Sequence, residues 1–195
     1  INSKGAIHYI TKEEIEKSKN YLANKITGQK IIALILGGPN KYYSFNNIEL
    51  SKIFNQIKLS FILKGYKVVV VPSMRTPKKI IELAKNEFAN NGYTVTNVDK
   101  NAYLSSLAIA DSIVVTCDST SMISEAAISG KPIFIAHMKT KKNNYRFKKF
   151  FQLFNDMGIT RNLGEKVEQW NYNSLNEVER VANLIKKKIE EHDFS

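Results

Sequence analysis

Short apolar runs alternate with amphipathic stretches along most of this 195-residue sequence. The clearest run is Ile31–Leu36 (IIALIL), which is uninterrupted and rich in β-branched side chains. A strand that is buried on both faces has this pattern. Comparable runs at 68–71, 93–98, 112–116 and 133–136 predict four further strands.

The stretches between these runs carry apolar residues at helical spacing. Leu50, Ile53, Phe54, Ile57 and Phe61 predict an amphipathic helix over 47–63. Other helices are expected at 12–25, from Pro77 onward, near 102–110, and at 121–129, 145–157 and 176–191. The first of these opens with Thr11-Lys-Glu-Glu14, which has the spacing of a capping box.

Strands and helices that alternate at this pitch predict an α/β fold, with a parallel sheet flanked by helices. Right-handed crossovers make it Rossmann-like, with strand order 3-2-1-4-5 when strands are numbered along the chain. We expect a single domain over 1–195, with a linker and leading helix at 1–28 and a C-terminal helix at 176–191. The sequence does not begin with Met, so we also expect that further chain precedes it.

Ligands of such sheets bind beyond the carboxyl ends of the strands, where the strand order reverses. The loop after 31–36 contains Gly37, Gly38 and Asn40. Glycines let backbone N–H groups approach a phosphate, and the following helix start favours negative charge. A plain tight turn explains the same residues, so both interpretations remain open here.

The loop after 68–71 contains Ser73, Arg75 and Thr76. An arginine at the end of a strand is well placed for bidentate hydrogen bonding to a phosphate. The alternative is a helix cap beside a surface arginine.

The segment Asp118-Ser-Thr-Ser-Met-Ile-Ser-Glu125 is the richest in candidate chemistry. Hydroxyls such as those of Ser119 and Ser121, with free N–H groups near Met122, can hold a diphosphate at a helix start. Glu125 can accept both hydroxyls of a ribose. The nearby helix dipole predicts that this carboxylate is ionised at neutral pH. Capping alone explains the residue types, but not so many hydroxyls in one place.

The net charge of +11 favours anionic partners, among them nucleotide phosphates and acidic membranes. Nearly all the cations are lysines, so a sequence bias that fills solvated faces is an equally good explanation. A single cysteine, Cys117, fits a small buried side chain in a reducing, cytoplasmic setting. The histidines show no metal-site spacing, and no cofactor, signal peptide or membrane span is expected.

Three stretches together resemble a known family. LILGGPNKYY, VPSMRTP and NAYLSSLAIADSIVVTCDSTSMISEAAISGKPIF are similar to the bacterial and plant Elongated Mitochondria (Elm-type) proteins, named for mitochondrial fission. That resemblance implies the C-terminal half of a GT-B architecture, similar to the peptidoglycan enzyme that adds N-acetylglucosamine to a lipid-linked acceptor. It places the glycine loop at Gly37-Gly38, the hydroxyl-rich helix start at Ser119 and Ser121, and the ribose contact at Glu125.

The resemblance implies two functions of different kinds. One is the nucleotide-sugar-binding half of a glycosyltransferase-like protein, with the sugar nucleotide as donor substrate. Its acceptor site and catalytic base would lie in an N-terminal domain that this sequence lacks, and the short GGPN loop departs from the transferase pattern. The other is a non-catalytic adaptor that recruits a dynamin-like partner to mitochondria. Nucleic-acid binding is a weaker alternative, because interleaved aromatic residues and known modules are missing.

Overall fold

The computed structural model of this chain describes residues 1–26, 30–164 and 167–193. At its centre is a parallel sheet of six strands in the order β3-β2-β1-β4-β5-β6. The strands are β1 Ile31–Leu36, β2 Lys67–Pro72, β3 Gly92–Thr94, β4 Ser112–Thr116, β5 Ile133–Ala136 and β6 Thr160–Asn162. The predicted parallel sheet and the order of its first five strands are therefore confirmed. Two positions of the expected leading segment, 27 and 28, lie outside the described residues.

The sheet forms because its central strands are apolar on both faces. Every residue of β1, β4 and β5 is buried. β1 pairs with β2 on one side and with β4 on the other, so the strand order reverses between β1 and β4. This reversal places the loops after β1 and β4 side by side at the carboxyl edge of the sheet.

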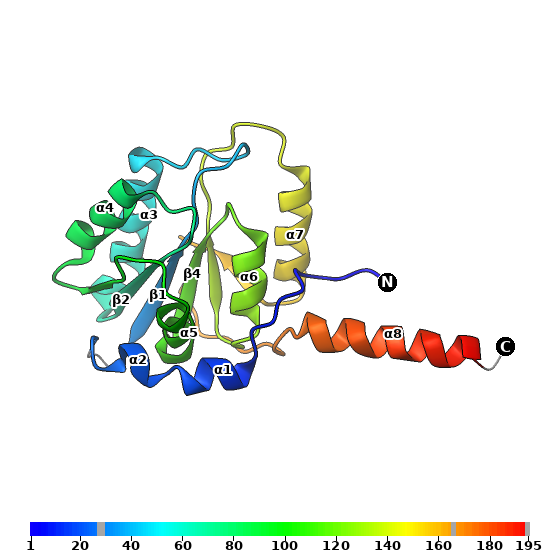
Figure 1. Ribbon diagram of the computed structural model, residues 1–195. Helices are drawn as coiled ribbons and strands as arrows, with labels where there is room; N and C mark the ends of the chain where they lie inside the picture. The colour runs from blue at the N-terminus through cyan, green and yellow to red at the C-terminus, as the bar shows by residue number, and fades with distance from the viewer. Residues whose placement is uncertain (27–29, 165–166, 194–195) are drawn as a thin grey trace.

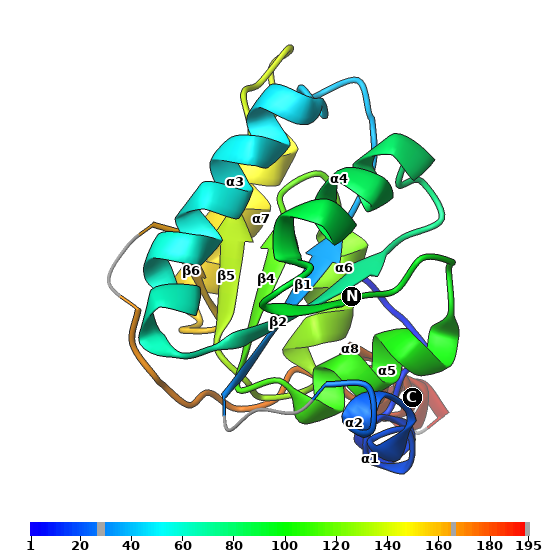
Figure 2. The same ribbon diagram turned by 90° about the vertical axis from the view of Figure 1, so that its left-hand side faces the viewer.

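Helices cover both faces of the sheet. Their bounds are α1 Lys12–Lys17, α2 Asn20–Ala23, α3 Asn47–Ser60, α4 Lys78–Phe88, α5 Lys100–Ile109, α6 Thr120–Ala127, α7 Tyr145–Asp156 and α8 Glu177–Asp193, with a 3-10 turn η1 at Ile62–Lys64. α3 and α4 lie on one face, and α6 and α7 lie on the other (Figures 1 and 2). α1 and α2 pack on the outside of α5.

Several predicted boundaries were wrong. The helix expected at 12–25 is two short helices, α1 and α2, although the capping box at Thr11 is present as predicted. The strand expected at 93–98 is β3, which spans only Gly92–Thr94; the residues at 96–98 are exposed and outside the sheet. Pro77 is the N-cap of α4 and not part of its first turn. β6 was missed because the sequence Thr-Arg-Asn has no apolar run.

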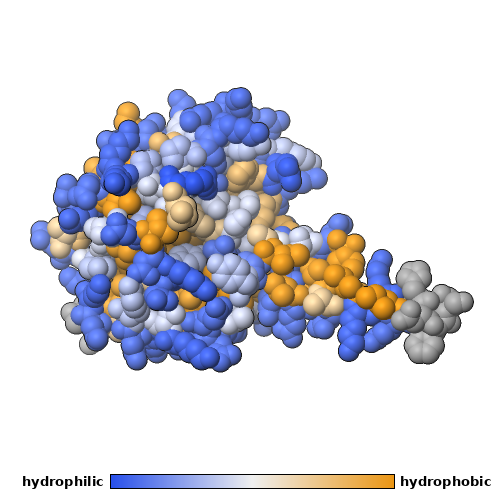
Figure 3. All heavy atoms as spheres, in the orientation of Figure 1, coloured by the Kyte–Doolittle hydropathy of each residue, from blue (hydrophilic) through white to orange (hydrophobic). Residues whose placement is uncertain are grey.

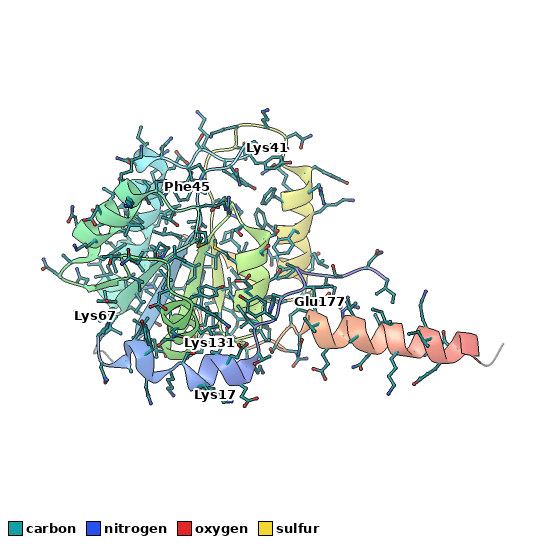
Figure 4. The ribbon with its side chains drawn as sticks, in the orientation of Figure 1. Lys17, Lys41, Phe45, Lys67, Lys131 and Glu177 are labelled. Atoms are coloured by element: carbon teal, nitrogen blue, oxygen red, sulfur yellow. The ribbon has the colours of Figure 1, made fainter. Side chains whose placement is uncertain are left out.

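The last helix, α8, projects away from the body of the molecule (Figure 1). It is held at its first turn by the Glu177 carboxylate, which accepts two hydrogen bonds from Arg180, at 2.6 and 2.8 Å. The same carboxylate accepts the Lys4 N–H at 2.6 Å, and Arg180 donates to the Asn2 carbonyl at 2.8 Å. This clamp therefore ties the beginning of the described chain to the start of α8, where Figure 4 labels Glu177.

Candidate functional site

A cavity of about 340 Å³ lies at the carboxyl edge of the sheet, where the strand order reverses. Its walls come from the N-terminal segment, the ends of β1 and β2, and the beginnings of α5 and α6. Five predicted site residues line it: Ser73, Arg75, Ser119, Met122 and Glu125. The structure thus brings together residues that lie up to about fifty positions apart in the sequence, at the point where open α/β sheets bind ligands.

The glycine loop lies beside this cavity without lining it. The Gly37 N–H donates to the Thr116 hydroxyl at 2.8 Å, and the Gly38 N–H donates to the Asp118 carboxylate at 2.9 Å. Both donors that the sequence offered to a phosphate are therefore already hydrogen-bonded within the protein.

The two glycines are required by close packing. A Cβ on Gly37 would lie 2.1 Å from an Asp118 carboxylate oxygen, and a Cβ on Gly38 would lie 2.1 Å from the Arg75 carbonyl oxygen. These separations are far below van der Waals contact. The absence of side chains lets the loops after β1, β2 and β4 approach one another.

Asp118 joins the three loops. Its side chain is fully buried, and it accepts hydrogen bonds from Gly38 N–H and from Arg75 Nη2, the latter at 3.0 Å. Burial raises the pKa of the Asp118 carboxyl, and the Thr116 hydroxyl, the Gly38 N–H and the Arg75 charge oppose that rise. Asp118 faces protein groups, so its evident role is to hold Arg75, which remains 45% exposed at the cavity wall.

Two other predicted residues also fasten the loops. The Asn40 side chain donates to the Asp118 carbonyl at 3.0 Å and accepts the N–H groups of Tyr42 and Tyr43. The Thr76 hydroxyl lies 2.9 Å from the Leu36 carbonyl oxygen and accepts the Ser73 N–H at 2.9 Å. Neither residue lines the cavity.

The start of α6 forms one wall of the cavity. Ser119 is the N-cap, and its hydroxyl accepts the Met122 N–H at 3.4 Å. Ser121 is exposed and lies outside the cavity lining. The N–H groups of the first turn of a helix attract anions, and here this turn lies on the same cavity as Arg75.

Glu125 lies in the second turn of α6, and its carboxylate accepts a hydrogen bond from the Tyr103 hydroxyl at 2.9 Å. Burial raises the pKa of the Glu125 carboxyl, while the Tyr103 hydroxyl and the charge of His8 oppose that rise. Burial is therefore the largest influence on this pKa, whereas a helix dipole acts mainly within the first turn; that Glu125 is ionised at neutral pH stays a prediction.

Sequence reasoning missed Tyr103 and the N-terminal wall of the cavity. Tyr103, on α5, and Tyr9, in the N-terminal segment, both line the cavity. Lys100 also lines it, and its ammonium lies 4.9 Å from the centre of the Tyr9 ring. Met74, at the rim, is 84% exposed. None of these positions carries a local motif, because their meeting depends on how α5 and the N-terminal segment pack.

Other candidate chemistries find little support among the described residues. No group of three His, Cys, Asp or Glu side chains there is arranged to hold a metal ion. Cys117 is buried, its sulfur accepts the Met138 N–H, and burial raises the pKa of its thiol to about 12. A thiol with so high a pKa is a poor nucleophile at neutral pH. Within the described parts of the chain, no helix combines the length and apolar character that a membrane crossing requires.

Comparison with known sequences identifies relatives of the chain. Residues 1–189 match the model of the family described as Mitochondrial fission ELM1. The uncharacterized protein RP120 of Rickettsia prowazekii is 32% identical over 202 residues, which cover 93% of this chain and 53% of that protein. The mitochondrial fission protein ELM1 of Arabidopsis thaliana is 24% identical over 198 residues, which cover 98% of this chain and 46% of that protein. The chain thus spans about half the length of the curated relatives it matches.

Solved structures match parts of this chain at low sequence identity. The C-terminal domain of LpcC, a glycosyl transferase group 1 family protein from Francisella tularensis, gives a TM-score of 0.44 at 13% identity, covering 77% of this chain and 87% of that one. The ADP-heptose LPS heptosyltransferase II of E. coli gives a TM-score of 0.45 at 14% identity, and the match covers 66% of this chain and 38% of that one.

Proposed function

This chain belongs to the mitochondrial fission ELM1 family, and we propose that its cavity binds a nucleoside diphosphate sugar, as the donor half of a GT-B-type, glycosyltransferase-like protein. The observation that carries the proposal is the meeting of Arg75, Glu125 and the start of α6 on one cavity. A cation, a carboxylate and free helix N–H groups match the diphosphate and the sugar hydroxyls of such a ligand.

In this arrangement Glu125 accepts the two ribose hydroxyls. An ionised carboxylate has no donor, and a ribose offers two donors side by side. The Tyr103 hydroxyl already donates to one Glu125 oxygen at 2.9 Å, which orients the carboxylate at the cavity wall.

The diphosphate lies between Arg75 and the N–H groups at the start of α6. Asp118 and the Gly38 carbonyl hold the guanidinium from behind, with Arg75 donating at 3.0 and 3.5 Å respectively. When the bond to the sugar breaks, negative charge develops on the leaving diphosphate. Arg75 and the helix N–H groups then stabilise that charge.

The acceptor site and the catalytic base belong, in this proposal, to the part of the full-length family protein that lies outside this chain. The chain covers only about half the length of its matched relatives. We therefore expect the chain alone to bind the donor without transferring the sugar.

The test is calorimetric titration of the chain with UDP, ADP and GDP, and with UDP-N-acetylglucosamine. The proposal expects one of these to bind with one site per chain, and expects Glu125→Gln and Arg75→Ala to weaken that binding. Glu82→Gln, an exposed position on α4, is the matched control. Binding that both site variants leave unchanged, or no binding of any probe, would overturn it.

A second function, that of a non-catalytic adaptor for a dynamin-like partner, is favoured by the surface of α8. Val178, Ile185 and Ile189 share one face of this helix and are exposed. Figure 3 shows apolar side chains gathered along α8 where it leaves the body. An apolar stripe of this kind on a projecting helix is typical of a protein contact.

The adaptor function predicts that a purified dynamin-like GTPase binds the chain and that Ile185→Glu abolishes the binding. Lys187→Glu lies on the polar side of the same helix and adds the same charged side chain, so it serves as the control. Loss of binding by Glu125→Gln with retention by Ile185→Glu would contradict the adaptor surface.

A further inference from the structure

Two segments at the carboxyl edge of the sheet, each a loop followed by the start of a helix, carry cations and no acidic residue. Positions 37–48 and 136–151 contain no Asp or Glu. They contain seven exposed cations, which we call the basic edge: Lys41, Lys139, Lys141, Lys142, Arg146, Lys148 and Lys149. The net charge of the whole chain is +11, so this small part of the surface accounts for much of it.

The fold holds the two loops together. Tyr43 and Thr140 form an antiparallel bridge, the Ser44 N–H donates to the Lys139 carbonyl at 2.8 Å, and the Lys141 N–H donates to the Tyr42 carbonyl at 2.8 Å. Beneath them, the buried Asn144 amide donates to the Tyr43 hydroxyl at 2.9 Å. The cations therefore project from one connected piece of backbone at the end of the molecule where Figure 4 labels Lys41.

No carboxylate within the described residues lies within ion-pair distance of any cation of the basic edge. Glu49 accepts the Lys139 N–H at 2.7 Å, but its side chain is almost buried and pairs with Lys52. Seven like charges that repel one another are unfavourable in the free protein. An external anionic partner would relieve that repulsion.

We propose that the basic edge binds the headgroups of an acidic lipid surface. Six of its seven cations are lysines, which act as flexible point charges and do not require the fixed geometry of a single ligand. The loops protrude at the end of the molecule (Figure 1), so several cations reach a flat surface together. Tyr145 is exposed among them, with the Lys149 ammonium 4.7 Å from its ring centre, and tyrosines favour the membrane interface.

Lipid binding by the basic edge does not depend on nucleotide binding, although both would occur at the same edge of the sheet. Lys41 follows β1 and Lys139 follows β5, and the cavity also lies at the carboxyl ends of the strands. A membrane bound by the basic edge would thus face the side of the sheet on which the cavity opens.

The experiment is sedimentation of the chain with vesicles of phosphatidylcholine alone or of an equal mixture of phosphatidylcholine and phosphatidylglycerol. The test variant is Lys41→Gln/Lys141→Gln/Lys142→Gln. The control variant is Lys12→Gln/Lys19→Gln/Lys64→Gln, which removes the same charge from exposed positions at the opposite end of the strands. Thermal unfolding checks that both variants remain folded.

We expect binding to the acidic vesicles only, weakening as salt is raised. The test variant should bind roughly a hundredfold less tightly, because each basic residue near an acidic bilayer contributes about fivefold. The control variant should lose far less. Equal losses in the two variants, or equal binding to neutral vesicles, would overturn the proposal. Binding of a short RNA through Lys41, Lys141 and Lys142 without vesicle binding would assign the basic edge to nucleic acid instead.

Discussion

The Asp118 carboxylate, which has no exposed surface, accepts a hydrogen bond from the Arg75 guanidinium, with 3.0 Å between Oδ2 and Nη2. The two residues come from the loops after β4 and β2, and the Gly38 N–H from the loop after β1 completes the contact. One buried acceptor thus aligns all three loops of the candidate site.

We predict that Arg75→Met destabilises the fold by about 1–3 kcal/mol at neutral pH, because it leaves Asp118 buried without its cation. Burial already raises the pKa of Asp118, and losing Arg75 should raise it further. When a carboxyl has a higher pKa in the folded than in the unfolded state, the free energy of unfolding falls as pH rises, because ionising the group costs more in the folded state. The deficit of the variant should therefore shrink as pH falls to about 4. Urea unfolding of the wild type and the variant at neutral pH and at about pH 4 measures this loss of stability. An equal loss at the two pH values would point to lost packing instead.

The second prediction concerns how strongly substitutions at Gly37 and Gly38 couple energetically to one at Asp118. Gly37→Ala and Gly38→Ala should each destabilise by about 1–3 kcal/mol, because each new Cβ meets an atom at 2.1 Å. The obstacle for Gly37 is the Asp118 side chain, whereas that for Gly38 is the Arg75 backbone. Asp118→Ala removes the obstacle at Gly37 but not the one at Gly38, so it should reduce the effect of Gly37→Ala more than that of Gly38→Ala. Double-mutant cycles by chemical unfolding check this, and equal coupling at both glycines would refute the assignment.

A third prediction concerns the phosphate contact. Arg75→Ala should weaken binding of a nucleoside diphosphate by about 1.5–3 kcal/mol, the worth of a charge-assisted hydrogen bond. Binding of the nucleoside without phosphates should change little, because the base and ribose lie away from the guanidinium. Calorimetry on both ligands makes the comparison. Equal losses would show that the substitution acts through the fold and not through the phosphates.

The fourth prediction tests the ribose contact. Glu125→Gln preserves size and can still accept the Tyr103 hydroxyl, but it replaces one acceptor with a donor. The wild type should bind a 2′-deoxynucleotide more weakly than the ribonucleotide. The substitution should then weaken ribonucleotide binding more than 2′-deoxynucleotide binding. The double cycle of protein and ligand isolates this coupling, and a coupling energy of zero would mean that Glu125 does not touch the sugar.

The layered fold could be predicted from sequence because its signals are local. Ile31–Leu36 is apolar throughout and forms β1 with the predicted bounds, and the runs at 112–116 and 133–136 likewise form β4 and β5. β6 could not be predicted in this way. Thr160, Arg161 and Asn162 join the sheet because β5 offers an open edge, which is a tertiary effect.

The candidate site was predictable only in part. The topology brings Arg75, Ser119 and Glu125 to one cavity because the first two follow the ends of strands and Glu125 lies in the second turn of the helix that begins after Ser119. Their partners carry no such signal. Tyr103 lies within α5, and its contact with Glu125 depends on the angle at which α5 and α6 pack. The raised pKa of Glu125 has the same origin, since burial is a property of the assembled fold.

The buried state of Cys117 has a practical consequence. It is the single cysteine of the sequence, and its buried thiol should not react with maleimide reagents. A cysteine introduced at exposed Met74 would then take up a fluorophore at one known position on the cavity rim. The native protein is thus already suited to single-site labelling, and changes in emission on adding ligand would report occupancy directly.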